Sequence, residues 1–484
     1  MLQYAFASTK RNAATQKHMP CPFHAILGLA SAAGPLAPSQ RASHIDLTPA
    51  ITRAVAFARR QLPVLNEKVL NRSLNPDRFI ENAIPVLLPF SEALFGSSSR
   101  WIRLFQQPAR IIGIPCEEQA REALRVLGFI IDSAERHAQA RGDAPGAALL
   151  AMRQTATVMT ILGYIAGTVP RSTAYTVWTG NPQESAIRFT NDPGEAAFHE
   201  AVVTIDALHG KTAAALRFVA LLDERPDSEA GIEVLTRAND FQRDVLAAYK
   251  KLAAKDESGG HVLTPRFFTT VFRTFLPTYP IDGTIFSGPN AAFLLNQRSV
   301  DTLTGVIDNR FKDFIVEHEI LYMPIEDRQR LTADLQCPSV PAQLCAVVLH
   351  LCFNKILEVP DAELASRMAE ASPSQREAFR QFFSLWNTAG RIRSVHRGFV
   401  RHWLEDEEKR LTDDEKKGLP VQANAGTGGA TMADLDGIVE MVRNNPRVAK
   451  LWYAFKSTEG DDASISSSQG GPDHPALQAV AVDS

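Results

Sequence analysis

The sequence has few of the features that mark membrane, secreted or nucleic-acid-binding proteins. Its 484 residues include five cysteines, an odd number without Cys-x-x-Cys spacing, so we expect buried thiols in a reducing compartment and no disulfide framework or zinc site. The formal net charge of −3 predicts no nucleic-acid partner. The longest uncharged runs contain proline, glycine and polar residues, which favours buried helices over membrane spans.

Acidic residues are absent from the first 45 positions, which nevertheless contain basic ones. This composition resembles a transit peptide, but we favour a flexible leader and a cytoplasmic protein. At the other end, residues 456–484 are rich in serine, glycine and aspartate with little to bury. This composition predicts a disordered tail.

Alternating strand patterns are scarce, and helical periodicity dominates from Asp46 onward, which predicts an all-α fold. The segments with the clearest helical pattern are Thr48–Leu62, Glu117–Arg141, Ala144–Thr168, Ala196–Leu222, Glu233–Lys255 and Met432–Val442. We expect a leader over 1–45, a small helical domain over 46–185 and a large helical domain over 186–455. The charged and glycine-rich stretch before the last helix predicts a mobile loop over 418–430.

One long helix is predicted from Ser372 to Arg410. Its start has serine, proline and Gln375 in the order of a capping box. Its apolar stripe consists of Phe379, Phe382, Phe383, Trp386, Ala389, Ile392, Val395, Phe399 and Trp403. His396 is in phase with this stripe, and Arg393 leaves the same face one turn earlier.

Two interpretations of His396 are open from the residues alone. It is either a core histidine hydrogen-bonded to a neighbour, which the spacing by itself favours, or an axial ligand of haem iron in a dry slot. Arg393 is correspondingly either an ordinary surface arginine or the partner of a haem propionate.

The chain from Phe189 to Leu451 resembles the indoleamine 2,3-dioxygenase family, haem enzymes that open the indole ring of tryptophan. The run Arg391-Ile392-Arg393-Ser394-Val395-His396 resembles the proximal helix of that family, which implies that His396 binds the iron of haem b. In the family, an arginine matching Arg393 pairs with an aspartate matching Asp301. Both residues are present here, far apart in the sequence.

Two further segments resemble the distal side of the family's haem pocket. Ser287–Asp301 is similar to its distal loop and the helix that follows, which implies that Ala291 lies beside the haem and Asn290 beside the substrate. Phe189–Asp206 is similar to its distal helix, which implies that Phe198 lies over the haem.

The resemblance also implies a substrate site. Thr264–Arg273 is similar to the helix that supplies the family's substrate-binding arginine, so Arg273 would hold the carboxylate of an amino acid. Phe268 of the same segment would contact the substrate. The run Gly426-Thr427-Gly428-Gly429 resembles the loop that closes on the substrate, which implies that Thr427 and Gly428 bind its amino-acid end.

The function implied by the resemblance is insertion of both atoms of O2 across the indole 2,3 bond of tryptophan or a related indole, giving N-formylkynurenine. The resemblance implies haem b as cofactor and O2 as co-substrate, with no side chain acting as general acid or base. The partner is a small aromatic amino acid or indoleamine. We expect a monomer, without a membrane or nucleic-acid partner.

Several residues depart from the family pattern. Pro289 and Asn290 replace a glycine and a serine of the distal loop, Thr269 replaces a phenylalanine, and Val202 replaces the distal serine. His199 replaces a second distal phenylalanine. It is either a hydrogen-bond donor to bound oxygen or a partly exposed helix residue, and the second is favoured.

Three other functions therefore stay open. The first is a related haem-dependent oxygenase of secondary metabolism, acting on a modified tryptophan or another aromatic amino acid and inserting one oxygen atom. The second is a non-catalytic haem-binding helical protein, such as a sensor or carrier, which would have no need of a carboxylate clamp. The third is a structural helical protein in which His396 is a core residue.

Overall fold

The structure is a computed structural model that describes residues 43–95, 113–221, 225–254, 262–417, 419 and 432–459. Most of these residues are helical, which confirms the predicted all-α class. The α-helices are α3 (Thr48–Arg60), α4 (Leu62–Leu70), α5 (Pro76–Phe95), α7 (Glu117–Ala140), α8 (Ala147–Ala151), α9 (Arg153–Ile165), α10 (Pro193–Leu221), α11 (Glu229–Ala253), α12 (Pro265–Thr270), α13 (Leu295–Leu303), α14 (Asn309–Phe314), α15 (Ile325–Gln336), α16 (Val340–Leu344), α17 (Asp361–Ala369), α18 (Pro373–Val400), α19 (Glu407–Arg410), α20 (Asp413–Lys417), α21 (Met432–Arg443) and α22 (Pro446–Thr458).

Short helical segments of other pitch connect many of these helices. Those with π geometry are η3 (Tyr175–Thr179), η7 (Ile315–Glu319), η9 (Cys345–Leu349) and η11 (Arg401–Asp406). Those with 3-10 geometry are η4 (Gln183–Ser185), η5 (Phe272–Phe275), η6 (Ala291–Phe293), η8 (Ile320–Tyr322) and η10 (Phe353–Glu358). The π segment η11 directly continues α18, so the helical path runs to Arg410 as the sequence predicts.

Short strands make two small pairs. β1 (Ser43–His44) lies parallel to β2 (Gly113–Ile114), and β3 (Tyr279–Ile281) forms an antiparallel hairpin with β4 (Thr284–Phe286). The hairpin turn is Asp282-Gly283, with φ of 48° and 79°, the left-handed conformation that a two-residue hairpin of this type requires. The chain leaves this hairpin directly into the segment that resembles the family's distal loop.

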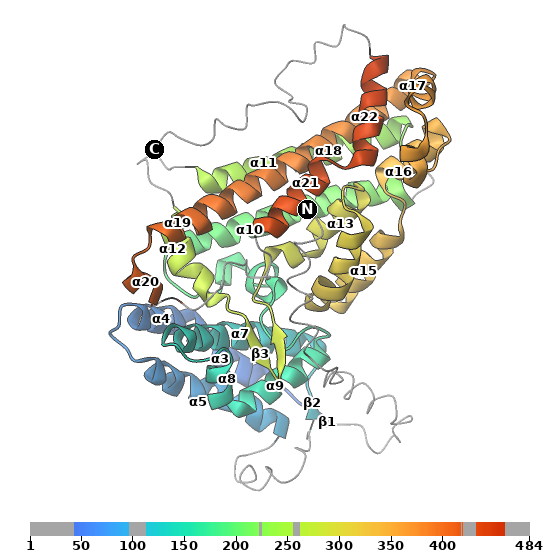
Figure 1. Ribbon diagram of the computed structural model, residues 1–484. Helices are drawn as coiled ribbons and strands as arrows, with labels where there is room; N and C mark the ends of the chain where they lie inside the picture. The colour runs from blue at the N-terminus through green and yellow to red at the C-terminus, as the bar shows by residue number, and fades with distance from the viewer. Residues whose placement is uncertain are drawn as a thin grey trace.

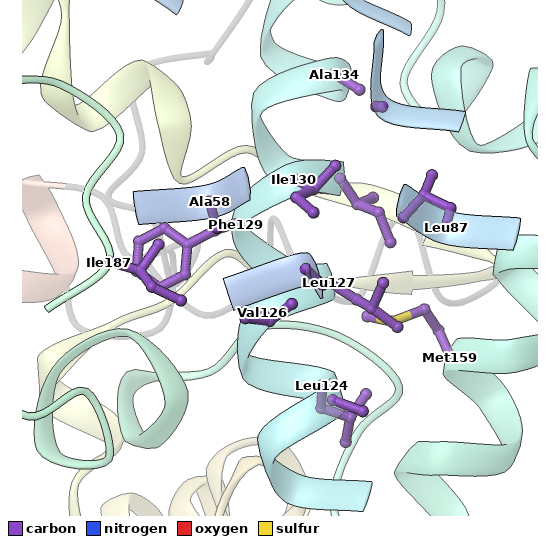
Figure 2. Close-up of a cluster of buried hydrophobic side chains, with 14 of the residues drawn as sticks. Ala58, Leu87, Leu124, Val126, Leu127, Phe129, Ile130, Ala134, Met159 and Ile187 are labelled. Atoms are coloured by element: carbon purple, nitrogen blue, oxygen red, sulfur yellow. The ribbon is translucent and has the colours of Figure 1, made fainter. Parts of the chain in front are cut away.

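The first hydrophobic core surrounds α7. Figure 2 shows part of it, with Leu124, Val126, Leu127, Phe129, Ile130 and Ala134 of α7 close to Ala58, Leu87, Met159 and Ile187 from other elements. This core also includes Phe272, Phe275 and Tyr279, so it crosses the boundary that we placed at residue 185. Because both faces of α7 are buried, its polar side chains need hydrogen-bond partners inside the protein.

The long helices α10, α11 and α18 lie side by side, as Figure 1 shows, with α11 in contact with both of the others. The N-terminus of α18 has the predicted capping box, in which the Ser372 hydroxyl and the Gln375 side chain each accept a backbone N–H of the other residue. A second core packs against its first half through Phe379, Phe382 and Phe383. This arrangement directs the second half of α18 toward the candidate site.

Two expectations from the sequence are wrong in detail. The predicted helix over Ala144–Thr168 is interrupted at Met152 and appears as α8 and α9. Of the described cysteines, Cys116 and Cys352 are exposed, so the expectation of buried thiols is correct for Cys345 but wrong for these two.

Within the described ranges, no helix is both long and apolar enough to cross a membrane.

Candidate functional site

His396 lies on α18 among half-buried apolar side chains. Its ring meets Tyr249 of α11 edge-on, with 6.1 Å between the ring centroids. The apolar residues gathered in this region, from α10, α11 and α18, are Ile205, Leu208, Val245, Leu246, Ala248, Tyr249, Ile392 and Val395. Burial, together with the positive charges of Arg393 and Arg298, lowers the pKa of His396 to about 4. The imidazole is therefore neutral at physiological pH, the form that binds a metal.

Arg393 and Asp301, 92 positions apart, form an ion pair one turn before His396. With its amide oriented to satisfy both groups, the Gln297 side-chain oxygen also accepts a hydrogen bond from Arg393 at 3.0 Å. Asp301 is 4% exposed and accepts a second hydrogen bond from Arg298 at 3.2 Å. The pairing that the resemblance implies is thus present in the structure.

Arg298 extends this ion-pair network. Its guanidinium donates to both carboxylate oxygens of Glu319, at 2.5 and 2.7 Å. The network therefore joins α13, the π segment η7 and α18 through buried, charge-assisted hydrogen bonds. It holds the Arg393 side chain near enough to His396 for the charge of Arg393 to lower the pKa of the imidazole.

Aromatic rings connect α10 to His396. Phe198 of α10 contacts Phe268 of α12, with 5.3 Å between ring centroids. Phe268 contacts Trp403 at 5.5 Å, and Trp403 contacts Phe399 at 5.0 Å. Phe399 in turn contacts Tyr249, the neighbour of His396, at 6.2 Å. The residues predicted for the distal and proximal sides thus belong to one continuous group of side chains.

Arg273 lies in η5, directly after α12. Thr264 caps α12 as predicted, accepting a hydrogen bond from the Phe267 backbone N–H at 3.1 Å. The ring of Phe272, the residue before Arg273 in the chain, lies 5.3 Å from that of Phe198. Burial lowers the pKa of Arg273, and the negative charge of Glu408 opposes that effect. Arg273 is half-buried, and partial burial strengthens the attraction of a guanidinium for a carboxylate.

The segment from Ser287 to Ala291 approaches the first core closely. A Cβ atom on Gly288 would lie 2.2 Å from the carbonyl oxygen of Leu276, so only glycine fits there. The Asn290 side chain accepts a hydrogen bond from the Ala292 backbone N–H at 3.0 Å and caps η6. Ala291 is half-buried and packs against the same core as Phe198. Asn290 therefore shapes this loop through its own side chain.

His199 has neither of the roles that its sequence position suggested. It is 5% exposed, so the favoured expectation of a partly exposed residue is wrong. Its Nε2 lies 3.0 Å from the Trp178 carbonyl oxygen, which can only accept, so that nitrogen carries a proton directed at the backbone. Two other departures are also explained locally, since Thr269 donates to the Trp403 carbonyl oxygen and Val202 is part of the first core.

Sequence reasoning missed several residues of the site. They are His209, Tyr249, Gln297, Arg298 and Glu319. His209 lies on the same face of α10 as Phe198 and Val202, eleven and seven residues after them, so helical periodicity would have found it. The others face the site from helices whose arrangement depends on the tertiary fold. Thr427 and Gly428 lie outside the described residues.

Comparison with protein-family models gave no match for the chain, and comparison with curated protein sequences also gave none. Within the described ranges, His, Cys, Asp and Glu side chains form no group of three or more that would suit a metal ion. A function is therefore inferred from the resemblance in sequence and from the geometry around His396.

Proposed function

We propose that this protein is a haem-dependent dioxygenase that acts on tryptophan or a related indole. The observation that carries the proposal is the Asp301–Arg393 ion pair, one turn before a neutral and half-buried His396. A core histidine would normally have its ring nitrogens occupied by hydrogen bonds. The ring of His396 instead meets the ring of Tyr249, which packs against an apolar cluster, and an apolar setting suits an axial ligand of a porphyrin.

The residues present suit a haem. The half-buried ring of Tyr249 meets that of His396, and the half-buried Leu208 and Val395 pack against the same apolar cluster as Tyr249. Apolar side chains of this kind suit the face of a porphyrin ring. Arg393 supplies positive charge for a propionate. When bound to His396, haem would supply the binding and activation of O2.

The remaining candidate residues suit an aromatic amino acid. The guanidinium of Arg273 would hold the carboxylate through paired hydrogen bonds, while the rings of Phe198, Phe268 and Trp403 would contact the indole and exclude water. Insertion of both oxygen atoms across the indole 2,3 bond would give N-formylkynurenine. Positioning of the substrate is the task of these side chains, and the reaction needs no general acid or base from them.

The absorption spectrum of protein produced with a haem precursor tests this function. We expect a Soret band that shifts on reduction and on addition of tryptophan, followed by the absorbance of N-formylkynurenine in the presence of O2. Mass analysis should show a product heavier than the substrate by two oxygen atoms. A gain of one atom would favour the related mono-oxygenase, and a Soret band without turnover on any aromatic amino acid would favour a haem carrier or sensor.

A pair of histidine variants tests the assignment of the ligand. His396→Ala should lose the Soret band, whereas His402→Ala, which changes an exposed histidine on the following helical turn, should keep it. A fully haem-loaded and active His396→Ala protein would show that the iron ligand lies elsewhere. Protein without any Soret band would contradict the whole proposal.

A further inference from the structure

His209 is a buried histidine whose protonation is determined by its neighbours. The Thr212 hydroxyl donates to the Leu208 carbonyl oxygen at 3.0 Å, so its own oxygen accepts from the Gln242 amide nitrogen at 2.9 Å. The same amide nitrogen lies 3.2 Å from Nδ1 of His209. Because an amide nitrogen only donates, Nδ1 accepts, and the proton of the neutral ring is on Nε2.

The Nε2 proton of His209 has no hydrogen-bond acceptor among the described residues. The residue is 4% exposed, so water does not take that role at the protein surface. Buried donors without partners are rare in folded proteins because leaving them unpaired is costly. An unpaired donor at this depth therefore points to an acceptor that the protein itself does not supply.

The surroundings of His209 indicate the charge of that acceptor. The pKa of the ring is lowered to about 4, mainly by burial and also by the positive charge of Arg393, while the negative charge of Asp301 opposes the shift. His209 is thus close enough to the Arg393–Asp301 pair to experience both charges. A neutral donor beside a guanidinium suits an anionic oxygen, which would interact with both groups.

We propose that Nε2 of His209 donates a hydrogen bond to a propionate carboxylate of the haem held by His396, on the side where Arg393 lies. This inference rests on the proposed function and adds a residue from α10 to the cofactor site. Three helices then hold the cofactor: α18 through His396 and Arg393, α11 through Tyr249, and α10 through His209, which Gln242 of α11 orients. His209 is a positioning residue, since it acts on the edge of the haem away from the reacting atoms.

A comparison of haem with haem dimethyl ester, which has no free carboxylate, distinguishes the proposed hydrogen bond to the propionate from general packing. The rate of haem transfer from the holoprotein to apomyoglobin is measured for wild type, His209→Leu and His209→Gln. Loss of a hydrogen bond to a charged group should speed the release of haem from His209→Leu by about tenfold or more. Release of the dimethyl ester should change little, and His209→Gln, which keeps an N–H donor, should restore much of the retention.

The outcomes separate this inference from the proposed function. His318→Leu, at an exposed histidine, is the matched control, and circular dichroism establishes that each variant is folded. The inference alone would be overturned if His209→Leu retained haem as well as the wild type does. It would also be overturned if His209→Leu released haem and haem dimethyl ester faster by the same factor. A change from six- to five-coordinate iron in His209→Leu would overturn it by making His209 an axial ligand. Failure of wild-type protein to bind haem would overturn both.

Discussion

At the scale of single residues, His137 is buried in its neutral form at the centre of the first core. It is 1% exposed, and its Nε2 lies 2.8 Å from the Asn66 side-chain oxygen. Its Nδ1 faces the guanidinium of Arg136 at 3.3 Å, so Nδ1 accepts and the ring has no room for a second proton. Burial and the charge of Arg136 lower the pKa of His137 well below its usual value.

His137 should therefore make the free energy of unfolding depend on pH. Its pKa is lower in the folded than in the unfolded protein, so its stabilising contribution is complete above pH ~6.5 and is lost as the pH falls toward the folded value. Urea denaturation of the apoprotein should show a loss of about 1.4 kcal/mol per pH unit from this residue below pH ~6. His137→Gln should have a shallower dependence, and an unchanged slope would contradict the prediction.

Arg273 and Arg266 provide a second test at the residue scale. Both belong to the segment that begins at Thr264, but Arg266 pairs with Glu407 and Glu415 and is exposed, whereas Arg273 is half-buried. Arg273→Ala should weaken substrate binding by roughly 10- to 100-fold, the effect of losing hydrogen bonds between charged groups. Substrate titration followed by the Soret shift measures this change.

Arg266→Ala serves as the control for that experiment and should bind substrate as wild type does. Haem content should be the same in both variants, because the proposed iron ligand is on α18. An equal loss of affinity in the two variants would mean that the segment was generally disturbed. Loss of haem from Arg273→Ala would contradict the assignment of this arginine to the substrate.

At the scale of elements, the ion-pair network of Asp301 fixes α13 against α18. Asp301→Asn keeps the shape of the side chain but removes the charge that balances Arg393 and Arg298. Breaking a buried pair in this way should lower the free energy of unfolding by roughly 3 kcal/mol and speed haem release. Asp313→Asn, at an exposed position of the neighbouring α14, should have little effect. Equal stability of the two variants in urea would show that the network is not important for stability.

Local sequence predicts those elements whose ends depend on nearby residues. The start of α18 follows from the Ser372–Gln375 capping box, and the start of α12 follows from Thr264. The break between α8 and α9 could not be predicted in this way. There, Glu135 of α7 accepts hydrogen bonds from the backbone N–H groups of Gly146 and Leu149, a tertiary contact that holds α8 apart from the longer helical pattern.

The candidate site shows the same division between local pattern and tertiary contact. The positions of His396 and Arg393 follow from helical periodicity, and the pairing with Asp301 follows from the resemblance. The orientation of His199 toward the Trp178 carbonyl oxygen depends on the path of the chain through η3, which has no clear signal in the sequence. The unpaired proton of His209 likewise depends on Gln242 of another helix.

At the scale of the whole molecule, Arg171 links the first core to the loop beside the candidate site. Its fully buried guanidinium faces Asp132 of α7 at 3.3 Å and donates to the carbonyl oxygens of Phe286 and Pro277 at 2.9 and 3.0 Å. It also lies over the ring of Tyr279, 4.3 Å from the centroid. A single side chain thus connects α7 to both ends of the β3–β4 hairpin, from which the chain continues into Ser287.

Arg171→Met should lower the free energy of unfolding by about 3–5 kcal/mol, because it leaves the Asp132 carboxylate buried without its counter-charge. Adding Asp132→Asn should recover part of that loss, whereas Arg121→Met, which removes exposed ion pairs, should cost at most about 1 kcal/mol. Since the hairpin positions the loop from Ser287 onward, Arg171→Met should also weaken substrate binding while haem is retained. Urea unfolding and substrate titration measure the two effects, and normal substrate binding in a destabilised variant would show that the loop is positioned independently of Arg171.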